Sequence, residues 1–233
     1  MGTSRIIHTG LASLALCGLL ATGACATPDT ALEPSGAAIT APAPGTSFDD
    51  YVQSTRQKLR DVISRTRFAG EEKPFGEHTL NQVVDMRAPY ALGPVGATCT
   101  DDDPALQGNG LGFLMVHGLT DSPYWLSDIR DNLRDRFPCA VFHGLLLSGH
   151  GTVPGDLLDV DYEDWLKTVR FGLNSFDDDI EHIIPMGFST GAALIGRVYS
   201  EQSDNHRVSA LVMLSPGLAA KSGQAWLTPY VRY

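Results

Sequence analysis

A serine between two glycines, in the stretch Gly187-Phe188-Ser189-Thr190-Gly191, is the feature of this sequence best suited to chemistry. An apolar run precedes it, and small and apolar residues of helical character follow it. This order predicts a strand, a sharp turn and a helix, with the Ser189 hydroxyl exposed where the strand ends. Gly187 and Gly191 suit such a turn because a Cβ at either position would collide with backbone. Thr190 begins the helix, so its backbone N–H can donate to an oxyanion formed beside Ser189.

Two motifs that combine histidine and glycine follow other predicted strands: His117-Gly118-Leu119-Thr120 and Gly149-His150-Gly151-Thr152. We expect the turn at Gly118 to point the Leu119 backbone N–H inward, where it would be the second oxyanion donor. The rings of His117 and His150 are expected to hold their loops by hydrogen bonds rather than to act as bases.

Alternating strands and helices must position these motifs. Apolar runs predict strands at 111–116, 139–145, 181–187 and 208–214, and helical spacing predicts helices at 122–137, 162–176 and 191–202. This alternation indicates an α/β fold with a mostly parallel sheet covered by helices on both faces. Sites in such sheets lie beyond the carboxyl ends of the strands, where all three motifs fall.

With these motifs in this order, the chain resembles the bacterial α/β-hydrolases related to carboxylesterases and monoacylglycerol lipases. The resemblance covers about Arg87 to Leu218. It implies a serine hydrolase of carboxylic esters that works through an acyl-serine intermediate on Ser189, with the Leu119 and Thr190 amides as oxyanion hole. It also implies a small-molecule or lipid ester as substrate and no cofactor or metal.

The acid and base of a serine triad do not follow Ser189 as that fold requires. They would come after two later strands, and 217–233 is too short for two further strand–helix units of about 30 residues each. Asp204 and His206 are expected at the opposite end of the sheet. The chain is therefore predicted to be a C-terminally truncated hydrolase that lacks its last strands and is catalytically incomplete. It is also predicted to be poorly soluble, because the strand at 208–214 would be an open apolar edge of the sheet. A non-catalytic binding protein for apolar ligands and an acyltransferase are the alternatives.

The N-terminal residues predict export. Residues 1–26 have the positive, apolar and small-residue regions of a signal peptide. The run that ends at Cys25 resembles a lipobox, so lipidation at Cys25, with membrane anchoring, and plain cleavage are both considered. The expected destinations are the periplasm, the outer envelope as a lipoprotein, or the medium. Residues 27–47, rich in Ala, Pro and Thr, predict a disordered linker before an incomplete hydrolase domain at 48–233.

The remaining features are less specific. Residues 49–67 predict an amphipathic helix packed on the outside of the domain, with a lid or a membrane-facing element as the alternative. The segment 69–110 gives weak strand signals at 80–86, and Asp101-Asp102-Asp103 reads as a solvated turn rather than a calcium loop. Cys99 and Cys139 could form a disulfide or remain two thiols. The net charge of −10 argues against a nucleic-acid partner.

Overall fold

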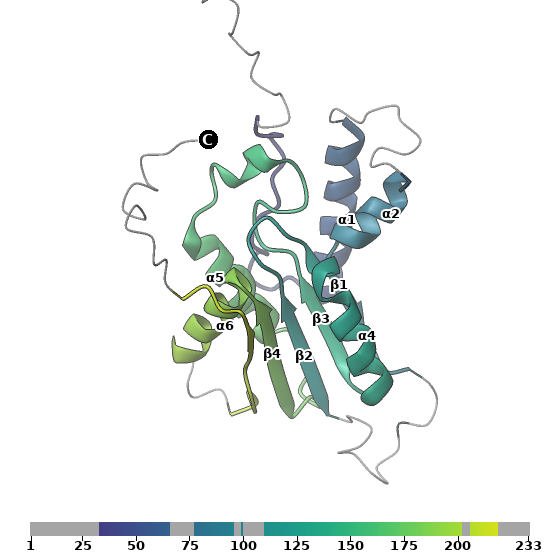
Figure 1. The fold of residues 1–233 in the computed structure, drawn as a ribbon, viewed down its shortest axis with the longest axis vertical. Coiled ribbons are helices and arrows are strands. Elements are labelled where there is room, and N and C mark those ends of the chain that lie inside the picture. Colours follow the sequence, from purple (N-terminus) through teal and green to yellow (C-terminus); the bar gives the residue numbers. More distant parts are fainter. Residues whose placement is uncertain (1–32, 66–76, 96–98, 100–109, 202–205, 219–233) are drawn as a thin grey trace, which may run out of the picture. The chain divides into compact units, whose positions relative to one another are not determined.

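A mixed sheet carries the fold (Figure 1). The computed structural model describes residues 33–65, 77–95, 99, 110–201 and 206–218, all within the unit Ala31–Tyr233. In these residues the sheet has five strands in the order β1-β3-β2-β4-β5. Only β1 is antiparallel to its neighbour; the others run parallel. The strands are β1 Tyr90–Leu92, β2 Leu111–Val116, β3 Val141–Leu145, β4 His182–Phe188 and β5 Val212–Leu214.

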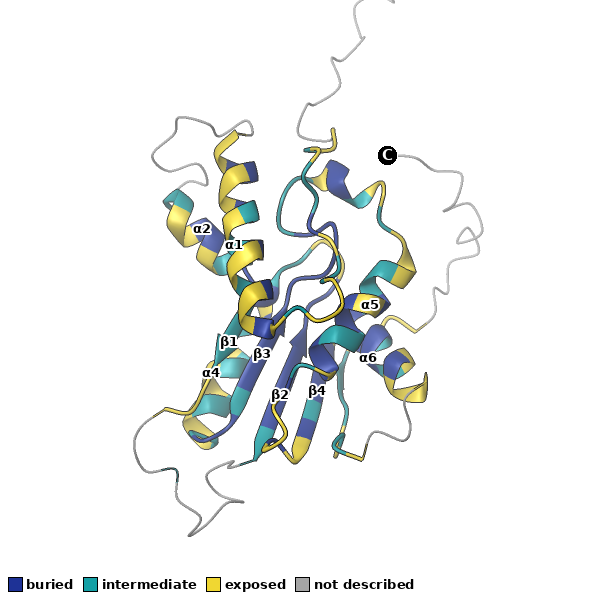
Figure 2. Ribbon diagram, turned by 180° about the vertical axis from the view of Figure 1, so that it is seen from behind, coloured by how far each residue is buried: buried dark blue, intermediate teal, exposed yellow. Residues whose placement is uncertain are grey.

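Helices cover both faces of the sheet. The first face carries α1 Phe48–Arg65, α5 Tyr162–Leu173 and α6 Thr190–Glu201, which pack on strand residues such as Leu114 and Leu145. The second face carries α4 Ser127–Arg136 and the short 3-10 helix η2 Pro123–Leu126. The central strands are buried on both sides, as Figure 2 shows, which explains their continuous apolar sequences. The predicted α/β class is confirmed.

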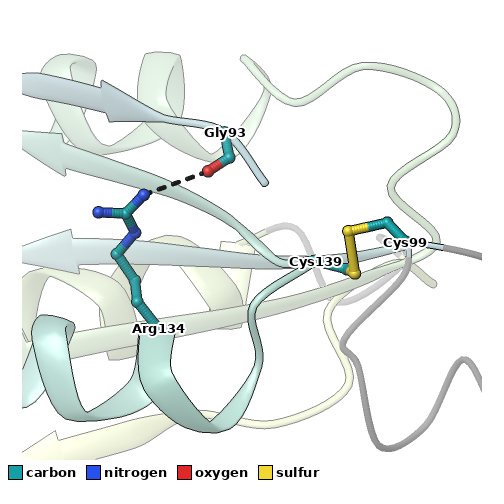
Figure 3. Close-up of a disulfide and its surroundings, with 4 residues drawn as sticks. All are labelled: Gly93, Cys99, Arg134 and Cys139. Atoms are coloured by element: carbon teal, nitrogen blue, oxygen red, sulfur yellow. Dashed lines mark hydrogen bonds between the residues drawn. A yellow bond between two sulfur atoms is a disulfide. The ribbon is translucent and has the colours of Figure 1, made fainter. Parts of the chain in front are cut away.

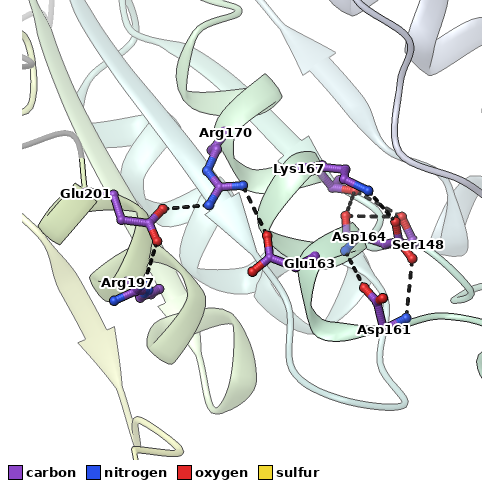
Figure 4. A network of polar contacts seen from close by, with 9 residues as sticks. Ser148, Asp161, Glu163, Asp164, Lys167, Arg170, Arg197 and Glu201 are labelled. Atoms are coloured by element: carbon purple, nitrogen blue, oxygen red, sulfur yellow. Dashed lines mark hydrogen bonds and ion pairs between the residues drawn. The ribbon is translucent and has the colours of Figure 1, made fainter.

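Ion pairs tie α5 to α6 on the outside of the first face (Figure 4). Arg170 on α5 donates to Glu201 on α6 at 2.6 Å, and Arg197 reaches the same carboxylate at 2.7 Å. The start of α5 has a capping box, in which the Asp161 side chain accepts from the Asp164 N–H. This network holds the helix that follows the serine turn against its neighbour.

Most predicted elements are present, with shifted ends. The predicted helix 122–137 is divided into η2 and α4, because Pro123 starts a 3-10 turn before the regular helix begins at Ser127. The predicted strand 139–145 begins two residues later, and the helix predicted at 49–67 is α1. Residues 208–214 are shorter as a strand than predicted: β5 spans Val212–Leu214, and Val208 forms only an isolated bridge with Ile183.

The segment after α1 was predicted wrongly. The weak strand signals at 80–86 belong to a helix, α2 Leu80–Arg87. Thr79 caps this helix by accepting from the Gln82 N–H, and the Gln82 side chain accepts from the Thr79 N–H at 2.8 Å. This capping box was visible in the sequence and outweighs the β-branched residues Val83 and Val84, which lie buried against α1. β1 was not predicted.

The predicted disordered linker is ordered over its described part, 33–47. Ile39 is only 2% exposed and packs against Leu59 of α1 and Leu146. The Ile39 carbonyl accepts from the Gly149 N–H at 2.8 Å. We call residues 33–47 the N-terminal strap. The buried Ile39 side chain, this hydrogen bond and the bonds of Ser35 with Asp156 hold the strap, although its composition is that of a linker.

A disulfide joins Cys99 to Cys139, two residues before β3, near the hydrogen bond from Arg134 to the Gly93 carbonyl (Figure 3). None of the described helices is both long and apolar enough to cross a membrane. The predicted signal peptide at 1–26, Cys25, Asp101–Asp103 and Asp204 lie outside the described residues.

Candidate active site

Ser189 lies on the tight turn between β4 and α6. Its φ angle is 51°, a left-handed conformation that non-glycine residues rarely adopt, and its side chain is half-buried. A Cβ on Gly187 would lie 2.5 Å from the Ala192 nitrogen, and one on Gly191 would lie 2.3 Å from the Val116 carbonyl oxygen. Both glycines are therefore needed for the helix to approach the ends of two strands. Strain of this kind is common at residues that must present a side chain for function.

Hydrogen bonds from the last described strand hold this turn. The Ser189 N–H donates to the Leu214 carbonyl at 2.9 Å, and the Ser189 carbonyl accepts from the Gly217 N–H at 3.1 Å. Ser215, between them, also has a positive φ of 45°. Sequence reasoning gave this turn no part in the site. The Pro216-Gly217 pair after an apolar run signalled a turn, but not that it would contact Ser189.

The loop after β2 packs directly beside the serine. A Cβ built on Gly118 would lie 3.3 Å from the Ser189 Cβ and 3.1 Å from the Phe188 ring. Among the described residues, neither the Leu119 N–H nor the Thr190 N–H donates to a protein acceptor. Thr190 is the first residue of α6, where helix N–H groups lack partners within the helix. Two free backbone donors thus flank the turn that carries the hydroxyl.

His117 holds this loop in place. The ring is fully buried, its Nε2 accepts from the Leu147 N–H at 3.0 Å, and its Nδ1–H therefore donates to the Gly118 carbonyl at 2.7 Å. Burial, with a smaller contribution from His150, lowers the pKa of His117 to about 3. His117 is neutral at physiological pH, and both of its ring nitrogens are occupied, so it is not available as a catalytic base.

His150 has the same kind of role in the loop after β3. Its Nε2 accepts from the Thr120 N–H at 3.2 Å, so its Nδ1–H donates to the Ser148 carbonyl at 3.0 Å. Burial lowers its pKa as well. The ring meets His117 edge to face at 5.0 Å between centroids. The two histidines therefore fix the loops after β2 and β3 against each other.

The described residues do not supply a base to Ser189. The hydroxyl has no side-chain hydrogen-bond partner among them. His206 is exposed and lies two residues before Val208, which pairs with Ile183 at the start of β4. Ser189 follows the other end of β4, and that end, at Phe188, is roughly 17 Å from Ile183 at the usual rise of a strand. In the same part of the chain, no group of three or more His, Cys, Asp or Glu residues is placed to hold a metal ion.

Several solved structures resemble part of this chain. A structure from the metagenome-derived lipolytic enzymes LipS and LipT is 19% identical, covers 59% of this chain and 49% of its own, and has a TM-score of 0.48. Est1E from Butyrivibrio proteoclasticus, with ferulic acid bound, is 18% identical, covers 56% of this chain and 49% of its own, and has a TM-score of 0.41. A putative hydrolase from Agrobacterium vitis S4 is 18% identical, covers 60% of this chain and 54% of its own, and has a TM-score of 0.40.

This chain thus spans about half the length of these structures. No protein-family model matches it, and no curated protein matches it in sequence. The identities are too low to carry more than a likeness of fold.

Proposed function

We propose that this chain, which has the α/β-hydrolase fold, is a serine hydrolase of carboxylic esters with Ser189 as nucleophile. The observation that supports this most is the strained turn at Ser189. Gly118 and the Leu119 amide lie on one side of this turn, and the Thr190 amide lies on the other. Strain at a half-buried hydroxyl, with unpaired N–H donors beside it, is the arrangement that acyl transfer to serine needs.

In the proposed reaction, the Ser189 oxygen attacks the ester carbonyl while a base removes its proton. The negative charge that develops on the carbonyl oxygen is stabilised by the Leu119 and Thr190 N–H groups. The alcohol then leaves with a proton, and water hydrolyses the acyl-serine to release the acid. His117 and His150 position the oxyanion loop and take no part in proton transfer. We propose that the base and its acid partner lie outside the described residues.

The experiment is covalent labelling with a fluorophosphonate, which reacts with activated serine hydroxyls. We expect one adduct, located by mass spectrometry on the peptide that contains Ser189. The Ser189→Ala variant should not label, whereas Ser200→Ala, which removes an exposed serine of α6, should label like the wild type. Equal labelling of wild type and Ser189→Ala would reject the proposal in favour of a non-catalytic binding protein.

We also propose that the protein is exported, with Cys25 either lipidated or removed with the signal peptide. The disulfide between Cys99 and Cys139 supports this proposal, because disulfides persist in oxidising compartments. Fractionation of cells that express the full chain, followed by mass spectrometry of its N-terminus, distinguishes the two forms. A Cys25→Ala variant that still fractionates with membranes would reject lipid anchoring at this residue.

A further inference from the structure

A cavity of about 330 Å³ lies beside the oxyanion loop. Its first wall is the loop after β2, from Thr120 to Ser122, together with Trp125 of η2; its second wall is the loop after β3, from Gly149 to Leu157. Arg87 at the end of α2 completes it. The first wall begins at Thr120, the residue after the oxyanion donor Leu119. Ser189 itself does not line the cavity, so a group held here would reach the serine through a carbonyl bound at the Leu119 N–H.

The second wall is fixed by contacts with the N-terminal strap. The Asp156 carboxylate is only 3% exposed and accepts from the Ser35 N–H at 2.6 Å, the Ser35 hydroxyl at 2.7 Å and the Thr152 hydroxyl at 2.5 Å. Gly149 donates to Ile39 of the strap, as described above. A buried carboxylate with three donors is a rigid support. The loop is thus held in one shape before any ligand binds.

The first wall is strained. Thr120 has a φ of 60°, which is an outlier for a β-branched residue. Its N–H is held by His150 of the opposite loop. The cavity wall is therefore forced into a costly conformation and kept there by the facing loop, which is typical of a binding site rather than of an unspecialised turn.

The lining combines an aromatic face with polar groups. The Trp125 indole is 71% exposed, and Val153, Pro154 and Leu157 add apolar surface. Arg87 brings a guanidinium, which donates to the Gly151 carbonyl at 2.8 Å, and Asp121, Ser122 and Thr152 add oxygen atoms. A long alkyl chain would desolvate these polar groups without replacing their hydrogen bonds, which costs free energy. A ring with oxygen substituents satisfies both kinds of surface.

We infer that this cavity is the acyl-binding subsite of the hydrolase, and that it selects compact acyl groups with an oxygen-substituted ring over long alkyl chains. The inference rests on the proposed function. The alcohol leaves first in that reaction, whereas the acyl group stays on Ser189 until water arrives, so a preformed cavity serves the acyl side. Two nearby residues do not contribute to this cavity: Leu146 is buried in the core, and Tyr124 lines a different surface depression.

The test uses the full chain with Ser189→Ala, so that binding is measured without turnover. The probes are two product acids, 4-hydroxyphenylacetate and octanoate, titrated by calorimetry. We expect 4-hydroxyphenylacetate to bind more tightly, and Trp125→Ala to weaken it by about 2- to 10-fold, as expected for the loss of one aromatic pair. Tyr124→Ala is the matched control, because this neighbouring aromatic is also exposed and does not line the cavity. It should leave the affinity unchanged.

Two outcomes would overturn the subsite: octanoate binding as tightly as the ring acid, or Trp125→Ala binding like Tyr124→Ala. Both substituted side chains are exposed, so thermal melts should confirm that the variants fold. Fluorophosphonate labelling of the wild type separates this inference from the proposed function. Labelling without binding of the ring acid rejects the subsite alone. Binding that depends on Trp125, without labelling of Ser189, rejects the hydrolase and with it the acyl role of the cavity.

Discussion

The Cβ position of Gly191 lies 2.3 Å from the carbonyl oxygen of Val116, so the first turn of α6 touches the end of β2 with no room for a side chain. This contact brings Ser189 to the loop that carries Leu119, the proposed oxyanion donor, because Val116 is followed directly by His117 and Gly118. The positions of Ser189, the proposed nucleophile, and of this loop are therefore both set by one close approach of the two backbones.

Gly191→Ala should destabilise the fold and remove labelling of Ser189. The added methyl group meets backbone atoms that cannot move independently, so we expect a loss of about 3 kcal/mol in the free energy of unfolding, measured by urea denaturation. Gly93→Ala is the control, since a Cβ there has no neighbour within 4 Å among the described residues. A Gly191→Ala variant as stable and as reactive as Gly93→Ala would contradict this packing.

Ser35 and Asp156 should be energetically coupled although they are 121 residues apart. Ser35→Ala leaves the buried carboxylate without one of its two hydroxyl donors, and Asp156→Asn removes the charge that strengthens these bonds. A double-mutant cycle in urea should give a coupling energy of about 1–2 kcal/mol. Ser54→Ala, on the exposed side of α1, should show no coupling to Asp156→Asn. Additive effects of the Ser35 and Asp156 substitutions would show that the strap does not support the cavity wall.

Acid should destabilise the protein through His143. This ring is stacked between Phe48 and Phe176, at 3.8 and 4.3 Å, and burial lowers its pKa to about 4. In the unfolded chain the His143 ring has its ordinary pKa of about 6.5, so it binds a proton at pH values where the same ring in the folded chain stays neutral. Stability is therefore full above pH 6.5 and falls as the pH drops from 6.5 to 4, by about 3 kcal/mol from this residue.

The measurement is urea denaturation at a series of pH values. His143→Phe keeps a ring in the stack but cannot titrate, so its unfolding free energy should fall less steeply between pH 6.5 and 4. The residual slope includes His117, whose pKa is lowered to about 3. His206→Gln, at an exposed position, should behave like the wild type. Identical slopes for His143→Phe and wild type would mean that His143 titrates normally in the folded chain.

Removal of the disulfide should destabilise the chain without changing the site. Cys99 and Cys139 close a loop with a sequence separation of 40, for which the chain-entropy estimate is about 4 kcal/mol. The Cys99→Ala/Cys139→Ala variant should melt earlier than the oxidised wild type and show no further change on addition of dithiothreitol. If dithiothreitol leaves the wild-type melting temperature unchanged, the two cysteines are not bonded in solution.

The sequence was sufficient for most of the regular elements and for the serine turn, although not for β1. β2 was predicted from Leu111 to Val116, and the structure has the same bounds. The steric need for glycine at 187 and 191 also followed from the residues alone, because the turn geometry forbids a Cβ. The helix α2 was within reach too, because the Thr79 and Gln82 capping box signals its start.

Other features came only from tertiary structure. They include the ordered strap, the disulfide as opposed to two thiols, the hydrogen bonds of Leu214 and Gly217 with Ser189, and the cavity beside Thr120. Hydrophobic period and turn residues are local signals, and they specify elements within a window of some ten to twenty residues. Contacts such as Ser35 with Asp156 join segments far apart in the chain, and no local pattern encodes which segments will meet. The sequence alone determined which serine would stand on the sharp turn, and the folded chain decided what surrounds it.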